Sequence, residues 1–267
     1  MADAMEMGVR RFGRVNWLGL YTLAAREVMR FTSIWPQTVL GPLITAGLFL
    51  AVFSLAIGPT RGAVMGVAFV QFLAPGILMM AVIQNAFTNT SSSLVVSKVQ
   101  GNIVDTLMPP LSPLELVLGF LAGGIARGAF VALPIWLLTV LFAGVGLAHP
   151  LWALTFLLLG GAFMGGLGMI GGIFARKFDQ MAAITNFVIT PLAFLSGTFY
   201  SVTTLPPSLE LLTRFNPVFY LIDGMRYAIL GVSDSSPLLG LAVVGSSTLV
   251  VMALCWRWFA SGYRLKS

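Results

Sequence analysis

Cysteine, histidine and charged residues are all scarce in this sequence. Its 267 residues include one cysteine, Cys255, and one histidine, His149, so an internal disulfide is impossible and a metal site within the chain is not expected. Only 9% of the residues are charged and 58% are hydrophobic, whereas soluble domains have roughly a quarter charged residues. These values exclude a soluble protein and make redox or zinc chemistry a poor expectation.

The positive charge is small and dispersed. Fifteen Lys and Arg residues against nine Asp and Glu residues give a net charge of +6. Nucleic-acid-binding proteins gather such charge in a basic patch, so no nucleic-acid partner is expected here. The opening residues MADAMEMGVRR include acids, and no short apolar core with a small-residue cleavage site follows them. We therefore expect no cleaved signal peptide.

Long apolar runs are what the sequence has in abundance. A helix that crosses a bilayer needs about 20 mostly apolar residues, because its backbone groups must all be paired in lipid. Six segments qualify: residues 36–57, 67–88, 114–145, 152–174, 181–199 and 237–258. The sequence predicts an all-α integral membrane protein with one transmembrane domain over residues 1–267.

The basic residues predict the orientation of these six spans. Eleven of them fall on the side that holds both ends of the chain: Arg10, Arg11, Arg14, Arg26, Arg30, Lys98, Arg176, Lys177, Arg257, Arg264 and Lys266. The opposite side holds Arg61, Arg214 and Arg226. Because cytoplasmic loops are enriched in Lys and Arg, both termini are predicted to be cytoplasmic.

Residues 15–31 predict an amphipathic helix that lies in the cytoplasmic membrane interface. The run VNWLGLYTLAAREVMRF carries apolar residues such as Trp17, whereas Arg26, Glu27 and Arg30 cluster at its end. Helices of this kind rest among lipid headgroups, and their arginines can contact anionic lipid. The segment is either a plain membrane anchor or a moving helix that forms part of a gate.

A very short helix is predicted after the second span, in SKVQGNIVDTLMPPLSP. Asn102 can cap its backbone donors, Asp105 adds negative charge to the first turn, and two prolines end it. Its apolar residues are more than a solvated turn requires: Ile103, Val104, Leu107 and Met108. The segment either docks in a groove of another protein or rests on the membrane surface.

One arginine is predicted deep inside a span. Arg127 lies about 20 Å along the third span, where an unpaired charge costs several kcal/mol in lipid. The surrounding GFLAGGIARGAF is rich in small residues that let a neighbouring helix approach closely. No acid lies at matching depth, so the expected partners are carbonyls, hydroxyls, water or an anionic ligand group. Its role is either structural or a contact with substrate.

Residues 200–236 are too apolar for an ordinary loop and predict two short helices. The first begins at Pro206 or Pro207 and carries Glu210 and Arg214 at the favourable i, i+4 spacing. Its neighbour is about 14 residues long, too short to cross a bilayer, so the pair is expected to dip into the outer leaflet and return. The two helices either plug the outer face or form an exit gate.

The second of these helices has strong start and stop signals. Asn216 is its expected cap, Pro217 its first residue, and Gly231 its stop. Its apolar residues line one face, and Asp223 and Arg226 are expected to lie away from that face.

The run from Pro191 to Gly231 resembles the pattern of type-2 ABC transporter permeases. The matching features are a small-residue end to the fifth span, Leu205-Pro206, Asn216-Pro217, Tyr220 and Arg226. The layout of the whole chain also agrees, including the interfacial helix with Trp17, Arg26, Glu27 and Arg30, the six spans and the turn after the second span. The resemblance implies a homodimeric permease of a bacterial inner membrane that pairs with two copies of an ATP-binding subunit.

The resemblance also implies roles for particular segments. The turn after the second span would be the coupling helix, with Gly101, Asn102, Ile103, Val104, Asp105, Leu107 and Met108. The outer gate would contain Pro206, Glu210, Arg214, Asn216, Pro217, Tyr220, Asp223 and Arg226. The exported substrate would be apolar or amphipathic: a drug, a lipid or a lipid-linked glycan. Candidate residues along its path are Phe49, Phe53, Phe72, Met79, Gln84, Asn85, Phe87 and Phe187.

The chain has no phosphate-binding loop of its own. Its three lysines, Lys98, Lys177 and Lys266, lie in no G-x-x-x-x-G-K-[ST] motif. ATP and Mg²⁺ are therefore expected on the partner subunit, with no cofactor and no catalytic residue in this chain. Two alternatives are an ion-coupled secondary transporter, which normally needs a midplane acid or broken helices, and a membrane enzyme, which needs convergent acid and base groups.

Overall fold

The structure is a computed structural model that describes residues 15–58 and 62–264. Within these ranges the chain is helical and contains no β-strand, which confirms the predicted all-α class. The basic residues Arg10, Arg11, Arg14, Arg61 and Lys266, used above in the orientation argument, lie outside the described residues.

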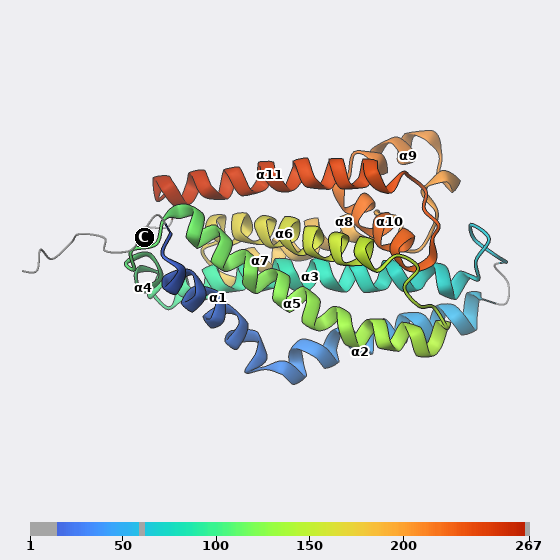
Figure 1. Ribbon diagram of the computed structural model, residues 1–267, viewed down its shortest axis with the longest axis horizontal. Coiled ribbons are helices and arrows are strands. Elements are labelled where there is room, and N and C mark those ends of the chain that lie inside the picture. Colours follow the sequence, from blue (N-terminus) through green and yellow to red (C-terminus); the bar gives the residue numbers. More distant parts are fainter. Residues whose placement is uncertain (1–14, 59–61, 265–267) are drawn as a thin grey trace, which may run out of the picture.

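Five helices are long and apolar enough to cross a membrane. They are α2 (Trp35–Val52), which continues through a π-helical turn (Phe53–Ile57), α3 (Phe69–Val99), α5 (Pro113–Ala143), α6 (Pro150–Phe174) and α11 (Pro237–Ser261). Figure 1 shows them extending along the long axis of the molecule. The predicted integral membrane architecture is thus confirmed for five of its six expected spans.

The fifth expected span, residues 181–199, has a different form. It consists of α7 (Phe178–Ile184), a π-helical turn (Thr185–Ile189) and α8 (Thr190–Phe194), which follow one another without a break. A helix of residues 178–194 is about 25 Å long, which is shorter than the hydrocarbon core of a bilayer at roughly 30 Å. Pro191 cannot donate a backbone hydrogen bond, which accounts for irregular helical pairing in this segment.

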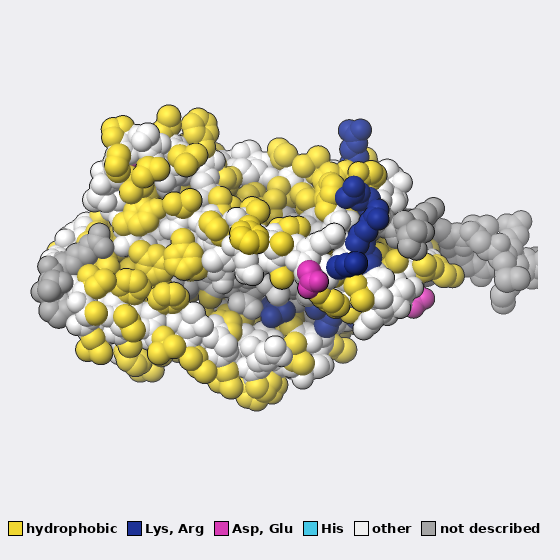
Figure 2. Space-filling model, turned by 180° about the vertical axis from the view of Figure 1, so that it is seen from behind, with side chains coloured by type: hydrophobic (Ala, Val, Ile, Leu, Met, Phe, Trp, Pro, Cys, Tyr) yellow, Lys and Arg dark blue, Asp and Glu magenta, His cyan; other side chains and the backbone are white. Residues whose placement is uncertain are grey.

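The remaining helices are short. They are α1 (Trp17–Thr32), α4 (Ile103–Leu107), a 3₁₀ turn (Val202–Thr204), α9 (Pro207–Arg214) and α10 (Pro217–Leu230). In Figure 1, α4 and the first turns of α1 lie at one end of the molecule, and α9 and α10 lie at the other. Figure 2 shows Lys and Arg side chains gathered near one end, with hydrophobic side chains over much of the remaining face.

Helix α3 forms the centre of the bundle and packs against α5, α6 and α10. It continues to Val99, eleven residues beyond the expected end of its span at residue 88, because its polar residues find partners inside the protein. Thr90 Oγ1, for example, donates to the carbonyl of Gly165 in α6 at 2.6 Å. Lys98 Nζ donates to the carbonyls of Gly172 and Ala175 at 2.9 and 3.4 Å, which fastens the ends of α3 and α6 together.

Glycines in α6 allow this close approach to α3. A Cβ atom at Gly168 would overlap the carbonyl oxygen of Phe87 and Thr90 Oγ1. A Cβ atom at Gly172 would lie 3.0 Å from the carbonyl oxygen of Ser91. Lipid tails are as apolar as the side chains of the helices, so the hydrophobic effect does not hold membrane helices together. Close packing of helix backbones is therefore a main source of stability in a membrane bundle.

Replacing Gly168 with alanine is expected to lower the stability of the bundle. The added methyl group would push α6 away from the backbone of α3, at a cost of about 1–3 kcal/mol. Thermal denaturation of the purified chain in nanodiscs measures the effect. The control is Gly245→Ala in α11, where an added Cβ meets nothing within 4 Å. Equal melting temperatures for the two variants would contradict the proposed packing role of Gly168.

Candidate functional site

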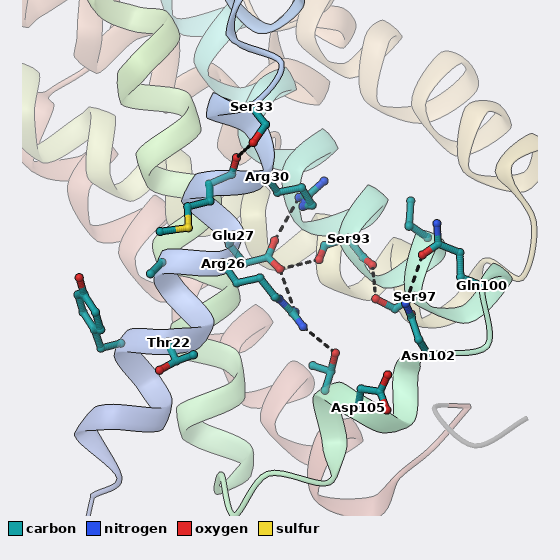
Figure 3. A pocket seen from close by; sticks show the side chains of 15 residues that line it. Thr22, Arg26, Glu27, Arg30, Ser33, Ser93, Ser97, Gln100, Asn102 and Asp105 are labelled. Carbon is teal, nitrogen blue, oxygen red and sulfur yellow. Dashed lines mark hydrogen bonds and ion pairs between the residues drawn. The ribbon is translucent and has the colours of Figure 1, made fainter.

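A groove of about 820 Å³ lies between α1, α3 and α4 (Figure 3). Its polar and charged lining comes from all three helices: Arg26, Glu27 and Arg30 from α1, Ser93 and Ser97 from α3, and Asp105 and Thr106 at α4. The groove brings the predicted interfacial helix and the predicted coupling helix together at one end of the bundle (Figures 1 and 3).

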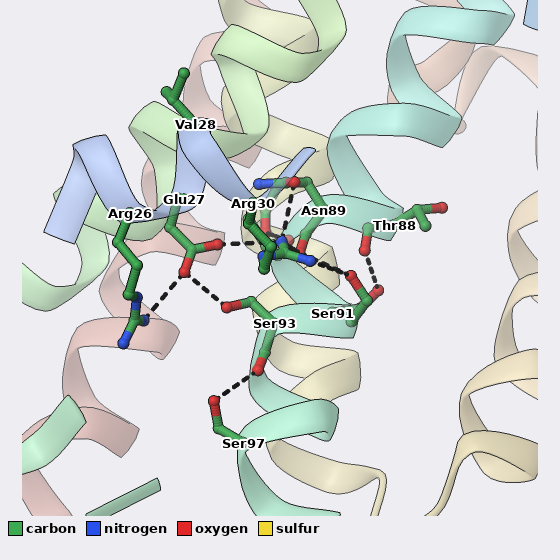
Figure 4. A network of polar contacts seen from close by, with 12 residues as sticks. Arg26, Glu27, Val28, Arg30, Thr88, Asn89, Ser91, Ser93 and Ser97 are labelled. Atoms are coloured by element: carbon green, nitrogen blue, oxygen red, sulfur yellow. Dashed lines mark hydrogen bonds and ion pairs between the residues drawn. The ribbon is translucent and has the colours of Figure 1, made fainter. Parts of the chain in front are cut away.

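Glu27 is the polar centre of this region. Its side chain is fully buried, and its carboxylate accepts hydrogen bonds from Arg26 Nη2 at 3.0 Å and from Ser93 Oγ at 2.7 Å. Arg30 Nη2 completes the set at 3.1 Å (Figure 4). A buried carboxylate is tolerated when it is paired and hydrogen-bonded in this way.

The two arginines extend the network to neighbouring helices. Arg30 Nη2 donates to the carbonyl and Oδ1 of Asn89 at 2.6 and 2.9 Å, and its Nη1 donates to Ser92 Oγ at 3.0 Å. Arg26 Nη1 donates to Thr106 Oγ1 of α4 at 2.9 Å. Helix α1 is therefore bonded to both α3 and α4.

This geometry adds a protein-facing role to the arginines of the N-terminal helix. Arg26 and Arg30, which the sequence suggested could contact anionic lipid, both pair with the buried Glu27 carboxylate on the bundle side and remain partly exposed. The outward face is apolar, and Trp17 and Tyr21 are both 72% exposed. The helix is amphipathic as predicted, with its charged residues on the protein side.

Helix α4 presents two different faces. Ile103 and Thr106 are buried against the protein, whereas Val104 and Met108 are exposed by 53% and 76%. Asp105 is also exposed. The helix has only five residues, shorter than the expected span of residues 101–108.

The start of α4 differs from the prediction in its capping. Asn102 is the N-cap residue, but its side chain makes no capping bond, and its Nδ2 instead donates to Gln100 Oε1 at 3.3 Å. Gly101 precedes it with a φ of +74°, a conformation that glycine adopts without steric cost. The turn is therefore set by Gly101, and the expected Asn102 cap is absent.

The half-buried arginine of α5 has an amide partner. Arg127 Nε donates to Asn85 Oδ1 of α3 at 3.2 Å. Both residues lie near the middle of their helices, as the expected depth of Arg127 requires. Among the residues that the structure describes, no carboxylate lies within ion-pair distance of Arg127.

At the opposite end, α9 and α10 match their predicted boundaries closely. The Asn216 side chain accepts from the backbone N–H of Val218 at 3.0 Å, Pro217 opens α10, and Gly231 ends it with a φ of +76°. In α9, Arg214 Nε and Nη2 donate to Glu210 Oε1 at 2.9 and 2.8 Å. Pro206 is the N-cap residue of α9, and Tyr220 is nearly buried in α10.

Asp223 and Arg226, which were expected to lie away from the apolar face of α10, are both buried inside the protein. Arg226 Nη1 lies 3.3 Å from Asp223 Oδ1 and 3.7 Å from Asp234 Oδ2. Its Nη2 donates to the carbonyl of Gly197 at 2.6 Å, and its guanidinium lies 4.0 Å from the ring centroid of Phe72. These contacts connect α10 to α3, to the segment after α8 and to the loop before α11.

The two aspartates hold that loop in place. Asp223 Oδ1 and Oδ2 accept from the backbone N–H groups of Asp234 and Ser235, each at 2.8 Å. Asp234 accepts from Ser201 Oγ and, at 3.1 Å, from the backbone N–H of Val202. The outer helices are therefore fastened by a buried ionic network, a role that sequence reasoning had not assigned to Asp234.

Sequence reasoning did not single out the polar residues of α3 that belong to these networks. The row Asn89, Ser91, Ser92 and Ser93 was visible as a polar run, NTSSS, and this interruption of an apolar stretch was the available signal.

Three of the candidate path residues, Phe72, Met79 and Phe87, are core residues, each at most 1% exposed. Phe187 is the opposite case, because it is 81% exposed.

Comparison with known proteins gives consistent matches over most of the chain. The profile of the family described as ABC-2 type transporter matches residues 19–230. The chain is 34% identical over 251 residues to the inner membrane transport permease YadH of Escherichia coli (strain K12), which covers 94% of this chain and 98% of that protein. It is 24% identical over 220 residues to nodulation protein J of Neorhizobium galegae, covering 82% of this chain and 83% of that protein.

These matches agree with the all-helical, strongly apolar structure. They confirm the resemblance found in residues 191–231 and in the layout of the chain. The profile covers well over half of the sequence, from α1 to the end of α10. The chain belongs to the ABC-2 type transporter family and is a membrane permease of an ABC transporter.

Proposed function

We propose that this chain is the permease subunit of an ATP-driven exporter, with ATP and Mg²⁺ bound and used by a separate subunit. Family membership supports association with an ATP-binding cassette subunit. The observation that carries the proposal is the exposed face of α4, with Val104, Asp105 and Met108, at the end of the molecule where α1 also begins. A short helix with an exposed apolar face suits a groove on a partner protein.

The contacts of α4 support a coupling role. Movement of α4 would act on Arg26 through Thr106 and then on Glu27, which is bonded to Ser93 of α3. The chain of contacts thus joins the proposed docking helix to the central helix of the bundle. The N-terminal helix would act as a linking element in addition to an anchor.

We propose a homodimer with two copies of the ATP-binding subunit. Symmetric pairing would place the same surfaces of both copies around one path. In this assembly the α7–α8 segment would serve as the sixth span, and its exposed Phe187 and Val188 would be covered by lipid or by the second copy.

The proposed orientation has both termini in the cytoplasm of a bacterial inner membrane. The described basic residues near the ends of the long helices support it, since Lys98, Arg176, Lys177 and Arg257 lie on the side expected to face the cytoplasm. The similar protein YadH of Escherichia coli is an inner membrane transport permease, which is consistent with this location. Helices α9 and α10 would then lie at the outer face as re-entrant helices.

The proposed substrate is apolar or amphipathic, such as a drug, a lipid or a lipid-linked glycan. The outer helices would form its exit gate. A pocket of about 520 Å³ between α8 and α9 supports this, because its lining includes Leu192, Leu209, Leu212 and Phe215. The partly exposed Glu210–Arg214 pair would stiffen α9 on the outer side of this pocket.

Val104→Asp is expected to weaken capture of the ATP-binding subunit and the associated ATPase activity by at least about tenfold, since it places a charge in the docking face. Copurification and ATPase activity in lipid measure the effect, with the ATP-binding protein encoded nearest to this chain as partner. Leu147→Asp is the matched control, because Leu147 is exposed at the far end of the chain's long helices. Normal complex formation by Val104→Asp would reject α4 as the coupling helix.

Family membership argues against an ion-coupled secondary transporter, and the same experiment tests that alternative directly. Transport driven by an ion gradient without any ATPase would favour it. The structure gives this alternative little support, because Glu27 and Asp223, the buried acids of the two networks, are both paired with arginine.

A further inference from the structure

A small cavity lies between α2 and α3, near the middle of both helices. Its volume is about 180 Å³, and its lining includes Thr45 and Phe49 of α2 with Met80, Gln84 and Asn85 of α3. Two amide side chains in a membrane bundle are costly unless they have polar partners. Asn85 has such partners, since it accepts from Arg127 and donates to the carbonyl of Ala81 at 3.0 Å.

Gln84 lines this cavity, and Arg127 is bonded to another lining residue, Asn85; both Gln84 and Arg127 keep polar groups free. Arg127 uses only Nε in a hydrogen bond, and its Nη1 and Nη2 atoms make none within the described residues. Neither nitrogen is a buried atom without a hydrogen-bond partner, so both are accessible from outside the chain. The Gln84 amide likewise makes no hydrogen bond within the described residues and is not enclosed.

The charged groups nearest to Arg127 along α3 are mainly positive. Arg30 is bonded to Asn89, one turn along α3 from the Asn85 partner of Arg127, and it belongs to the groove network with Arg26 and Glu27. The four charged residues have three positive charges and one negative charge. A guanidinium with two free terminal nitrogens is well suited to bind two oxygens of a phosphate group.

Polar side chains connect the cavity with the groove at the α4 end. Asn85 and Asn89 lie one turn apart on α3, and Asn89 is bonded to Arg30, which lines the groove. Ser93 and Ser97 continue the row along α3. Helix α2, which lines the cavity with Thr45 and Phe49, also exposes Ile44 and Leu48, by 58% and 60%, so it has an apolar outer surface.

On these grounds we propose that Arg127, Gln84 and Asn85 bind the phosphate headgroup of an amphipathic substrate midway through the bilayer. The apolar chain of this substrate lies against α2 and the lipid. This inference rests on the proposed export function and assigns a substrate class to it. It also gives Arg127 a ligand-binding role in place of a purely structural one.

The test compares ligands that share one tail. Native mass spectrometry of the chain alone in nonionic detergent measures binding of dodecyl phosphate, dodecyl glucoside and dodecyltrimethylammonium. The wild type is expected to prefer dodecyl phosphate. Arg127→Gln should weaken dodecyl phosphate binding about tenfold and leave dodecyl glucoside unchanged, because one charge-assisted contact is lost. Arg127→Lys should retain binding to within about threefold.

Two further variants keep the test decisive. Arg176→Gln removes an exposed positive charge far from the cavity and should leave all three affinities unchanged. Gln84→Leu removes the open amide and should weaken only dodecyl phosphate binding, which covers the case in which Arg127→Gln does not fold. Unchanged phosphate preference in Arg127→Gln, or equal loss of all three ligands, would overturn the proposal.

Inorganic phosphate separates a headgroup site from a site for the free anion. Millimolar inorganic phosphate should not displace dodecyl phosphate, and full displacement at equal concentration would reject an amphipathic ligand. Because this assay omits the ATP-binding subunit, a failure of the permease assignment appears in copurification and leaves these affinities unaffected. The two proposals can therefore fail independently.

Discussion

Arg226→Leu is expected to lose about 3–5 kcal/mol of stability and to release the outer helices from the bundle. The variant leaves the buried Asp223 and Asp234 without their guanidinium partner, and it removes the bond to the carbonyl of Gly197. A buried carboxylate without a partner is far more costly than a buried pair. Thermal denaturation in nanodiscs should show a single large decrease in melting temperature.

Arg214→Leu is the matched control for this substitution. Arg214 also pairs with a carboxylate at i, i+4 spacing, but both partners are about one-third exposed. Exposed pairs contribute no more than about 1 kcal/mol, so only a small change is expected. Adding Asp223→Asn to Arg226→Leu should recover part of the loss, because it removes one uncompensated charge. Equal stability of the two arginine variants would show that the Arg226 network does not hold α10.

Glu27→Leu is expected to detach α1 and to lower stability by about 3–5 kcal/mol. The substitution removes the carboxylate that joins Arg26, Arg30 and Ser93, and it leaves two cationic side chains against the bundle. The link from α4 to α3 through Arg26 and Glu27 is lost as well. ATPase activity of the assembled transporter should therefore decrease together with the melting temperature.

Thiol labelling can detect the detachment of α1 directly. The only native cysteine, Cys255, is buried, so a Leu23→Cys reporter on the inner face of α1 gives an almost background-free signal. The reporter should react slowly with a maleimide when Glu27 is present and at least about tenfold faster in Glu27→Leu. Glu210→Leu, which removes a partly exposed carboxylate of α9, should leave the rate unchanged. Slow labelling in Glu27→Leu would mean that apolar packing alone holds α1.

Much of the fold was predictable because its signals are local. Apolar length predicted six spans, five of which are long helices, and Asn216, Pro217 and Gly231 predicted the bounds of α10 almost to the residue. The Glu210–Arg214 pair also follows from spacing along one helix. The α7–α8 segment was harder, since composition alone does not show that its helical pairing changes to a π turn.

The sequence by itself determined the membrane location, the helical class, the short helices α9 and α10, and the transporter family. Only the tertiary structure decided which way the charged residues point. Arg26 and Arg30 turn inward because Glu27 is buried against Ser93, and Asp223 and Arg226 are buried because Asp234 and Gly197 meet them from other segments. These partners are far apart in sequence. Helical periodicity describes the faces of one helix, whereas ion pairing between segments depends on how the helices are packed.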